Sequence, residues 1–162
     1  MDILCCGTQY APQRRIFLSS LFQGRHVLLV EDSAIIAMGQ EIVLRDLGFV
    51  TTTVYRGEDA VQFVREHETV DIVLMDIDLG EKMDGLGAAR RIRAFRDVPV
   101  LFLAAQRDPQ IVEQALSIST YGYVQKGSGD FVLQEAIRMA FELARIRSQL
   151  RRERDLDARP EQ

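Results

Sequence analysis

Short apolar runs alternate with longer segments of helical periodicity along most of the chain. The short runs are continuously apolar and rich in β-branched residues, whereas the longer segments repeat apolar residues at spacings of three and four positions, which is typical of helices. The short runs predict strands at residues 26–30, 49–54, 71–75, 98–105 and 121–125. The longer segments predict helices at residues 33–47, 57–68, 84–95 and 108–119, and a last helix that begins at Gly129 or Asp130 and runs well past Leu150.

Residues that start or stop helices support these boundaries. Ser33 is a candidate N-cap for the first helix, and Gly48 is expected to stop that helix. Pro109 falls at the first position of a later helix, where its missing N–H costs little.

The order of these elements predicts an α/β fold with one buried parallel sheet. The strands around Leu29, Leu74 and Leu101 are apolar at every position rather than at alternate positions, which is typical of strands that are buried on both faces. Right-handed crossovers would place helices on both sides of such a sheet. A doubly wound, five-stranded sandwich is therefore the compact arrangement of these units.

Carboxylates follow two of the predicted strands. Glu31 and Asp32 come directly after the first strand, and Asp76 comes directly after the third. In a flavodoxin-like strand order, 2-1-3-4-5, these strands are neighbours, and the ligand crevice of such sheets lies beyond the carboxyl ends of the strands. Three converging carboxylates would repel one another unless a hard cation lies among them, and Mg²⁺ fits this role. Lys126, at the end of the fifth strand, could reach an anion beside the metal, so the group describes a place to hold a phosphoryl group.

Composition places the chain among ordinary globular proteins. Its 162 residues are 47% hydrophobic and 27% charged, which suits one domain with extensions. The net charge of −4 gives no reason to expect a nucleic-acid surface, and no apolar run approaches the roughly 20 residues of a membrane span. The start of the chain lacks the features of a secretory signal. Its two cysteines, Cys5 and Cys6, are adjacent and cannot form a disulfide framework, so we expect a reducing, cytoplasmic setting.

Several fragments in a fixed order resemble the response-regulator receiver domains of two-component signalling. They are "VLLVEDS" with the acidic pair Glu31 and Asp32, "VLMDIDL" with Asp76, the following "MDG", "PVLFLAA", and "GYVQK" with Lys126. Each fragment alone is a weak signal, but all of them at these intervals are highly specific. The resemblance covers the chain from Arg25 to about Arg147 and implies a flavodoxin-like (βα)5 fold.

The resemblance implies a role for each matched position. Asp76 would accept a phosphoryl group from a phosphohistidine, and Lys126 would pair with a phosphoryl oxygen. Magnesium would be held by Glu31, Asp32, Asp76 and the backbone carbonyl of Asp78. The donor would be a sensor histidine kinase or a phosphotransfer protein, and the longer loop between Asp76 and Gly85 resembles receivers that work with HWE or related kinases.

The chain departs from the family pattern at two places. The family has Thr or Ser at the end of the fourth strand, where this chain has Ala104, whose methyl group can donate no hydrogen bond to a phosphoryl oxygen. The usual switch, in which the aromatic residue at Tyr123 moves inward, is therefore in doubt, and Tyr123 could instead stay in the space that Ala104 leaves. Gly127 stands where a proline often follows the lysine, which is expected to loosen that turn.

Each candidate residue also has a simpler structural explanation when it is taken alone. Asp32 could cap the helix that follows it, and Asp76 could be an ordinary carboxylate at the end of a strand. Lys126 could be a solvated turn residue, and Tyr123 a half-buried strand aromatic. The coincidence of the three charged residues with Glu31 favours the functional interpretation.

The two ends of the chain match the receiver pattern less well. Residues 1–24 form an extension, either disordered or with a short amphipathic helix, and residues 25–147 form the predicted receiver domain. Residues 148–162 are either a solvated charged tail or an extension of the last helix, which could pair with a second copy as a homodimer or with a kinase. The chain leaves no room for a DNA-binding or catalytic output domain, which predicts a stand-alone receiver with an unknown downstream protein partner and no nucleic-acid contact.

The function that these observations predict is that of a phosphoacceptor signalling domain, not a conventional enzyme. It would catalyse only its own phosphorylation and dephosphorylation in a Mg²⁺-dependent phosphorelay. One alternative is a pseudo-receiver that binds proteins without being phosphorylated, because of Ala104. A second alternative is a phosphatase of the haloacid dehalogenase type, because "DIDLG" resembles its Asp-x-Asp-x-Thr motif, although Gly80 stands at the fifth position.

Overall fold

Five parallel strands form one sheet at the centre of the computed structural model, which describes residues 22–80, 82–105, 108–118 and 121–157. The strands are β1 (His26–Val30), β2 (Val50–Val54), β3 (Ile72–Asp76), β4 (Val100–Ala104) and β5 (Tyr123–Gln125). Their order is β2-β1-β3-β4-β5, and every neighbouring pair is parallel. The predicted flavodoxin-like strand order is therefore confirmed.

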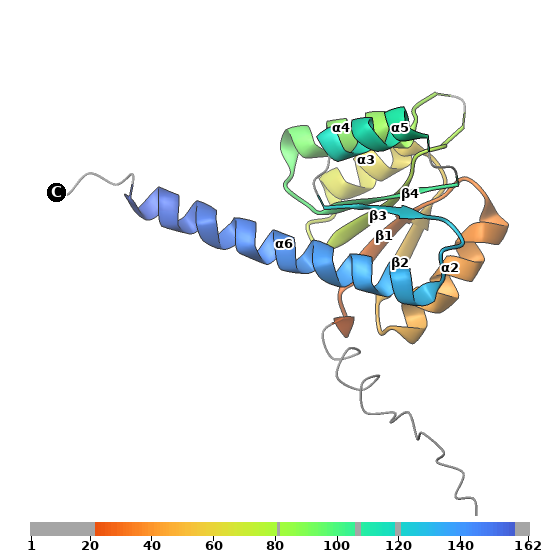
Figure 1. The fold of residues 1–162 in the computed structure, drawn as a ribbon, viewed down its shortest axis with the longest axis horizontal. Helices are drawn as coiled ribbons and strands as arrows, with labels where there is room; N and C mark the ends of the chain where they lie inside the picture. Colours follow the sequence, from red (N-terminus) through yellow and green to blue (C-terminus); the bar gives the residue numbers. More distant parts are fainter. Residues whose placement is uncertain (1–21, 81, 106–107, 119–120, 158–162) are drawn as a thin grey trace, which may run out of the picture.

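Helices cover both faces of the sheet, as Figure 1 shows. The helices are α2 (Ala34–Asp46), α3 (Gly57–Glu66), α4 (Gly85–Phe95), α5 (Pro109–Ile118) and α6 (Asp130–Asp157). Side chains of α3, α4 and α5 share one buried cluster with the sheet. Side chains of α2 and α6 share a second cluster on the opposite face.

The continuous apolar pattern of the central strands follows from this two-sided core. Successive side chains of a strand point to opposite faces of a sheet. In β1, Leu28 joins the cluster beneath α3 to α5, whereas the next residue, Leu29, joins the cluster beneath α2 and α6. Both side chains are fully buried. A polar residue at any central position of β1, β3 or β4 would therefore lose hydration on one face or the other.

Most element boundaries lie within three residues of their predicted positions, and the differences have physical causes. The predicted strand at 98–105 begins only at Val100, because Pro99 has no N–H to donate to the ladder. Gly48 ends α2 as expected, and its φ of +95° is a left-handed conformation that favours glycine. Ser33 is the N-cap of α2, but its side chain makes no capping hydrogen bond.

The described structure begins inside the predicted N-terminal extension. Phe22 is almost fully buried, and its ring stacks on that of Phe49 with 4.8 Å between the centroids. Phe141 of α6 lies beside both rings. The amphipathic helix considered near residue 14 lies almost entirely outside the described residues. At the other end, α6 continues without interruption through the predicted boundary after residue 147.

No helix among the residues that the structure describes is both long enough and apolar enough to cross a membrane.

Candidate functional site

The predicted charged residues meet at the carboxyl end of the sheet. Glu31 and Asp32 directly follow β1, and Asp76 is the last residue of β3 rather than the residue after it. The register pairs Val30 with Met75, so Glu31 and Asp76 stand side by side at the ends of adjacent strands. Lys126 directly follows β5 and extends its ammonium group across β4 to reach them.

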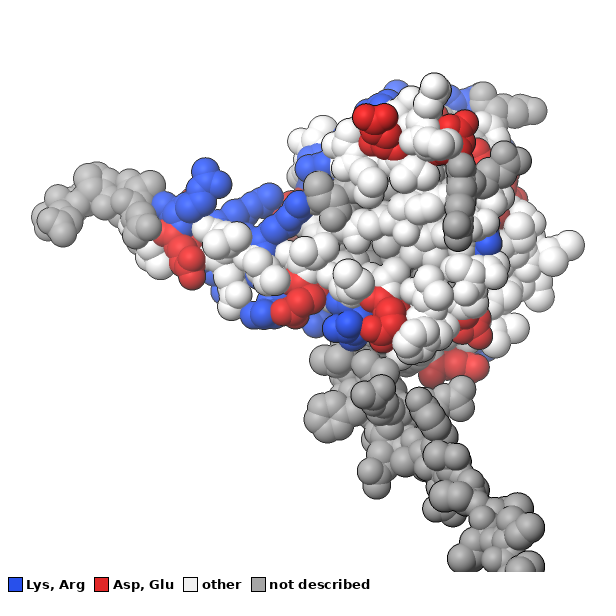
Figure 2. All heavy atoms as spheres, in the orientation of Figure 1, with Lys and Arg blue, Asp and Glu red and all other residues white. Residues whose placement is uncertain are grey.

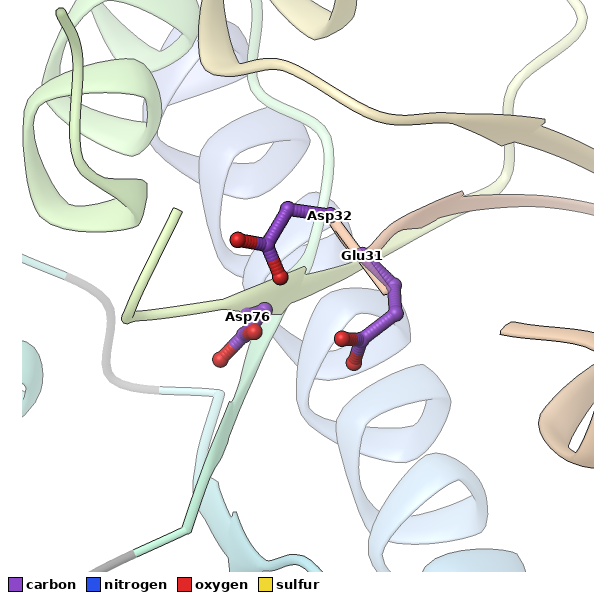
Figure 3. A group of neighbouring side chains, drawn as sticks. All are labelled: Glu31, Asp32 and Asp76. Atoms are coloured by element: carbon purple, nitrogen blue, oxygen red, sulfur yellow. The ribbon is translucent and has the colours of Figure 1, made fainter. Parts of the chain in front are cut away.

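The three carboxylates point toward one another (Figure 3). One oxygen from each of Glu31, Asp32 and Asp76 lies within 4.8 Å of the others. The Nζ atom of Lys126 lies 2.5 Å from Glu31 Oε2 and 2.7 Å from Asp76 Oδ2. The exposed fraction is 1% for the Glu31 side chain and 3% for that of Asp76, whereas Asp32 is exposed to solvent.

The electrostatics of this cluster depend on burial and on the shared ammonium group. Burial raises the pKa of Glu31, because removal from water disfavours its charged form, and the nearby Lys126 only partly opposes this. Burial lowers the pKa of Lys126, but the hydrogen bond to Asp76 and the contact with Glu31 outweigh it, so that this pKa is raised. The lysine is therefore a fixed positive charge at the buried side of the cluster.

The donor set fits a hard divalent cation. The three carboxylates carry more negative charge than the one ammonium group beside them can balance. Their oxygen atoms are the ligand type that Mg²⁺ prefers, and the exposed position of Asp32 leaves room for the water molecules that Mg²⁺ retains. The simpler explanation that Asp32 caps α2 does not hold, because Ser33 occupies the N-cap position.

Short backbone contacts hold these side chains in place. The backbone N–H of Asp78 donates to Asp76 Oδ1 at 3.2 Å, and the N–H of Ser33 donates to Glu31 Oε1 at 3.3 Å. The N–H of Lys126 donates to the carbonyl of Ala104 at 2.8 Å, which fixes the start of the lysine turn. The next residue, Gly127, has a φ of +78°, a conformation that proline cannot adopt. The departure from proline at this position therefore reflects a different turn.

Gly85 is a part of the site whose structural role the sequence did not reveal. It is the first residue of α4, and a Cβ atom there would lie 1.9 Å from the carbonyl oxygen of Asp76 and 2.9 Å from Ile77 Cα. The N–H of Gly85 donates to the Ile77 carbonyl at 3.0 Å. Helix α4 thus packs directly on the backbone of Asp76. The fragment "MDG" in the sequence was the signal that could have pointed to Gly85. Asp84 caps the same helix by accepting from the Gly87 N–H at 2.7 Å.

Ala104 and Tyr123 lie where the sequence placed them, on the adjacent strands β4 and β5. Ala104 is the last residue of β4 and is buried, and Tyr123, the first residue of β5, is half-buried. Tyr123 packs against the cluster of apolar residues that includes Ala104. A switching role for this pair, and the predicted metal contact through the backbone carbonyl of Asp78, stay predictions.

A cavity of about 530 Å³ adjoins the exposed side of the cluster. It is bounded by Asp32, by the first turn of α3 and by the loop between β3 and α4. Arg56 and Lys82 contribute positive charge to its lining, and Glu58 and Asp59 contribute negative charge. The cavity gives a path from solvent to the carboxylates, and no pattern in the sequence had indicated it.

Comparison with known proteins gives one consistent family. The family model described as the response regulator receiver domain matches residues 27–138. The DNA-binding response regulator MtrA of Mycobacterium tuberculosis is 34% identical over 131 residues, which are 81% of this chain and 53% of MtrA. The transcriptional regulatory protein CseB of Streptomyces coelicolor is 35% identical over 127 residues, or 78% of this chain and 50% of CseB. The chain thus spans about half the length of the curated relatives that it matches.

Solved structures show the same likeness. The N-terminal domain of a response regulator/sensory box/GGDEF 3-domain protein from Carboxydothermus hydrogenoformans is 36% identical, with a TM-score of 0.71, and the match covers 76% of this chain and 98% of that one. The signal receiver domain of a modulated diguanylate cyclase from Desulfovibrio desulfuricans is 29% identical, with a TM-score of 0.70 over 77% of this chain and 99% of that one. These matches favour the resemblance on which the site was predicted over the haloacid dehalogenase alternative.

Proposed function

The chain belongs to the response-regulator receiver domain family, and on this premise we propose that Asp76 accepts a phosphoryl group from a histidine kinase or a phosphotransfer protein. Receiver domains are signalling domains of two-component systems, and phosphorylation and Mg²⁺ are typical of the family. The observation that carries the proposal is the convergence of three carboxylates and the Lys126 ammonium group at the end of the sheet.

The proposed metal ligands are Glu31, Asp32, Asp76 and the backbone carbonyl of Asp78. When bound, Mg²⁺ would supply positive charge to oxygens of the transferring phosphoryl group. Glu31 supports this assignment because burial raises its pKa, so that its ionised form would gain from a second cation beside Lys126.

The reaction that we propose needs little beyond the residues described. A carboxylate oxygen of Asp76 attacks the phosphorus atom of a phosphohistidine, an O–P bond forms, and the N–P bond breaks. The imidazole leaves with the electron pair of that bond and takes a proton from solvent. Lys126, whose ammonium group is 2.7 Å from Asp76 Oδ2, is close enough to stabilise the negative charge that the phosphoryl group adds. Attack by water on the aspartyl phosphate would later release phosphate, so the domain would catalyse only its own phosphorylation and dephosphorylation.

The partner that donates the phosphoryl group must contact the rim of this site. Helix α2 exposes Ile35, Met38 and Ile42, whose spacing of three and four residues forms one apolar stripe, and Ile35 lines the same groove as Lys126. A groove of about 440 Å³ runs between this helix and the loop after β5 and includes Lys126 in its lining. We assign this surface to the donor, because a helix of a kinase or phosphotransfer protein could lay apolar residues into it and bring its histidine to Asp76.

Ala104 makes the consequence of phosphorylation different from that in relatives with a hydroxyl at this position. Its methyl group cannot hydrogen-bond a phosphoryl oxygen, so the end of β4 would not be drawn toward Asp76. We therefore propose that Tyr123 keeps its half-buried position in both states and that the output face is biased toward one conformation. Comparing structures with and without a phosphoryl mimic would test this, since inward movement of Tyr123 on binding the mimic would contradict it.

The output that we propose is a contact with another protein. MtrA is named for DNA binding and CseB for transcriptional regulation, and both extend well beyond the matched region, so DNA binding is no part of this proposal. The stand-alone organisation, the HWE type of the kinase and the cytoplasmic location stay predictions.

The first experiment is the intact mass of the protein after incubation with Mg²⁺ and acetyl phosphate or phosphoramidate. We expect one phosphoryl group on the wild type and on Asp78→Asn, and none on Asp76→Asn. The Asp78 variant is the matched control, because it removes a neighbouring exposed carboxylate. If no adduct forms with these donors or with a cognate kinase, the pseudo-receiver alternative, for which Ala104 is the motivation, replaces this proposal.

The donor surface is tested separately. Met38→Glu places a charge on the α2 stripe without touching Asp76, and it should slow transfer from a kinase while leaving phosphorylation by acetyl phosphate unchanged. Leu116→Glu is the control, because Leu116 is similarly exposed but lies on α5. Equal loss with both phosphoryl donors would show damage to the site itself and would contradict the assignment of this surface.

A further inference from the structure

The longest helix, α6, carries apolar side chains on two opposite faces. One face covers the sheet, where Ile137 and Ala140 are fully buried and Phe141 packs against the core. The other face exposes Met139, Leu143, Ile146 and Leu150, with exposed fractions between 37% and 57%. We call these four residues the α6 seam. Figure 1 shows that the helix carries this region along the sheet and then projects beyond the domain.

The spacing of the seam is that of a two-helix coiled coil. Its residues follow one another at intervals of four, three and four positions, which are the d, a, d and a positions of a heptad. An ordinary helix of a single domain needs only one apolar face, and α6 already buries that face. A second face with strict heptad spacing has no use within the domain.

We propose that the α6 seam pairs in parallel with the seam of a second copy of this chain. The proposal does not depend on phosphorylation of Asp76. The seam begins nine residues after α6 starts, which is about 14 Å along the helix from the end that follows Lys126.

Flanking charges favour the parallel direction. Glu142 and Arg147 occupy a g position and the e position five residues later, which face each other between parallel helices. Two oppositely charged pairs, from Glu142 of each copy to Arg147 of the other, would therefore form in exchange for the contacts of Glu142 with Arg145 and of Arg147 with the Tyr121 ring within each chain. In an antiparallel pair with the seam in register, Glu142 would face Gln149 and Arg147 would face Ala140, so no charge pair would form. Figure 2 shows that acidic and basic side chains are interspersed along α6.

The domain itself limits the assembly to two copies. Leucine at a positions with isoleucine at a d position would otherwise favour three or four helices, and larger bundles also bury the e and g positions. Here the e position at the start of the seam faces the domain, because Ala140 is fully buried in the cluster beneath α6. Only one partner helix can then reach the seam.

The affinity between the two copies should be low but measurable. The seam is about 16 Å long, from eleven helical steps of about 1.5 Å between Met139 and Leu150, which is short for an isolated coiled coil. However, α6 is already ordered by its packing on the sheet, and the distal Arg151 forms an ion pair with Asp97 at 2.6 Å. The copies would therefore associate with little loss of conformational freedom.

The first test is sedimentation velocity of the full chain over a range of concentrations. We expect the wild type to form dimers, and Ile146→Lys to raise the dimer dissociation constant by about 30-fold or more, as for a central interface residue. The control is Leu116→Lys, which places the same charge on another exposed apolar position. A monomeric wild type at high micromolar concentration, or equal weakening by both variants, would overturn the proposal. A monomer whose kinase binding is lost only in Ile146→Lys would assign the seam to the kinase instead.

Disulfide crosslinking gives an answer that does not depend on the folding of a charged variant. In a background with Cys5→Ser and Cys6→Ser, Leu150→Cys should form a disulfide-linked dimer under mild oxidation, because a positions face each other in a parallel pair. Asp155→Cys, at an f position on the same helix, should not. If Leu150→Cys crosslinks only when mixed with Met139→Cys, the helices are antiparallel, and the proposed direction is wrong.

Discussion

Replacing Gly85 with alanine should destabilise the fold at the phosphoacceptor strand. The added Cβ would lie 1.9 Å from the carbonyl oxygen of Asp76, whereas carbon–oxygen contacts in proteins begin at about 3.3 Å. The start of α4 and the end of β3 must therefore separate by more than about 1 Å. The atoms that the Cβ would meet belong to the backbone of Asp76 and Ile77. No rotation of a side chain can therefore relieve the clash.

The expected magnitude follows from two opposing effects. Overpacking of this kind costs about 1–3 kcal/mol, and the clash with backbone places this site at the upper end of that range. The change from glycine to alanine returns at most about 1 kcal/mol of helix propensity. We therefore expect a net loss of about 2 kcal/mol in the free energy of unfolding, which lowers the melting temperature by about 4–8 °C for a chain of this size.

The assay is thermal and urea unfolding followed by far-UV circular dichroism, with Gly39→Ala as the matched control. Gly39 also lies in a helix, α2, but a Cβ there would meet nothing within 4 Å. This control should gain up to about 1 kcal/mol. Because Asp76 must move with its backbone, Gly85→Ala should also be phosphorylated more slowly by acetyl phosphate. The reasoning is refuted if Gly85→Ala is as stable as Gly39→Ala.

Three further outcomes are expected. Arg96 donates hydrogen bonds to four carbonyls in and after α3, those of Val64, His67, Glu68 and Val70. Arg96→Ala should therefore lower the free energy of unfolding in urea by about 2–3 kcal/mol. A full rescue by Arg96→Lys, which lacks the planar guanidinium, would contradict the idea that these hydrogen bonds cause the loss. Lys126→Met leaves Glu31 and Asp76 buried without their ammonium group, so its melting temperature without Mg²⁺ should fall below that of the wild type. Addition of Mg²⁺ should then raise the melting temperature of the variant by more than it raises that of the wild type. An equal rise in both proteins would argue against a metal site here. Burial lowers the pKa of His26 below its usual 6.5, so the unfolded chain binds a proton at this residue before the folded chain does as the pH falls. The wild type should therefore lose stability relative to His26→Gln between about pH 7.5 and pH 5.5. A difference in unfolding free energy that stays constant with pH would contradict this prediction.

Several features of the fold could be predicted from the sequence because they depend on local pattern. The continuous apolar runs at Leu29, Leu74 and Leu101 indicated strands buried on both faces, and Gly48 indicated where α2 ends. The acidic residues after the first and third strands indicated a shared site, since neighbouring parallel strands end at one edge of the sheet.

Other features were hidden because they depend on contacts between distant segments. Phe22 reads as part of an extension, yet it stacks on Phe49 and lies beside Phe141, which are 27 and 119 residues further along the chain. Arg96 reads as one of several surface arginines, and only the fold brings the carbonyls after α3 within its reach. No periodicity in the sequence encodes either contact.

The sequence by itself determined the alternation of strands and helices, the edge at which the carboxylates gather and the family to which the chain is similar. These depend on residue type and spacing, which act over a few positions along the chain. The tertiary structure decided that Lys126 reaches Glu31 and Asp76 together, that Gly85 must lack a side chain, and that one face of α6 remains exposed. Those outcomes depend on how closely separate elements approach, and packing in three dimensions alone sets that distance.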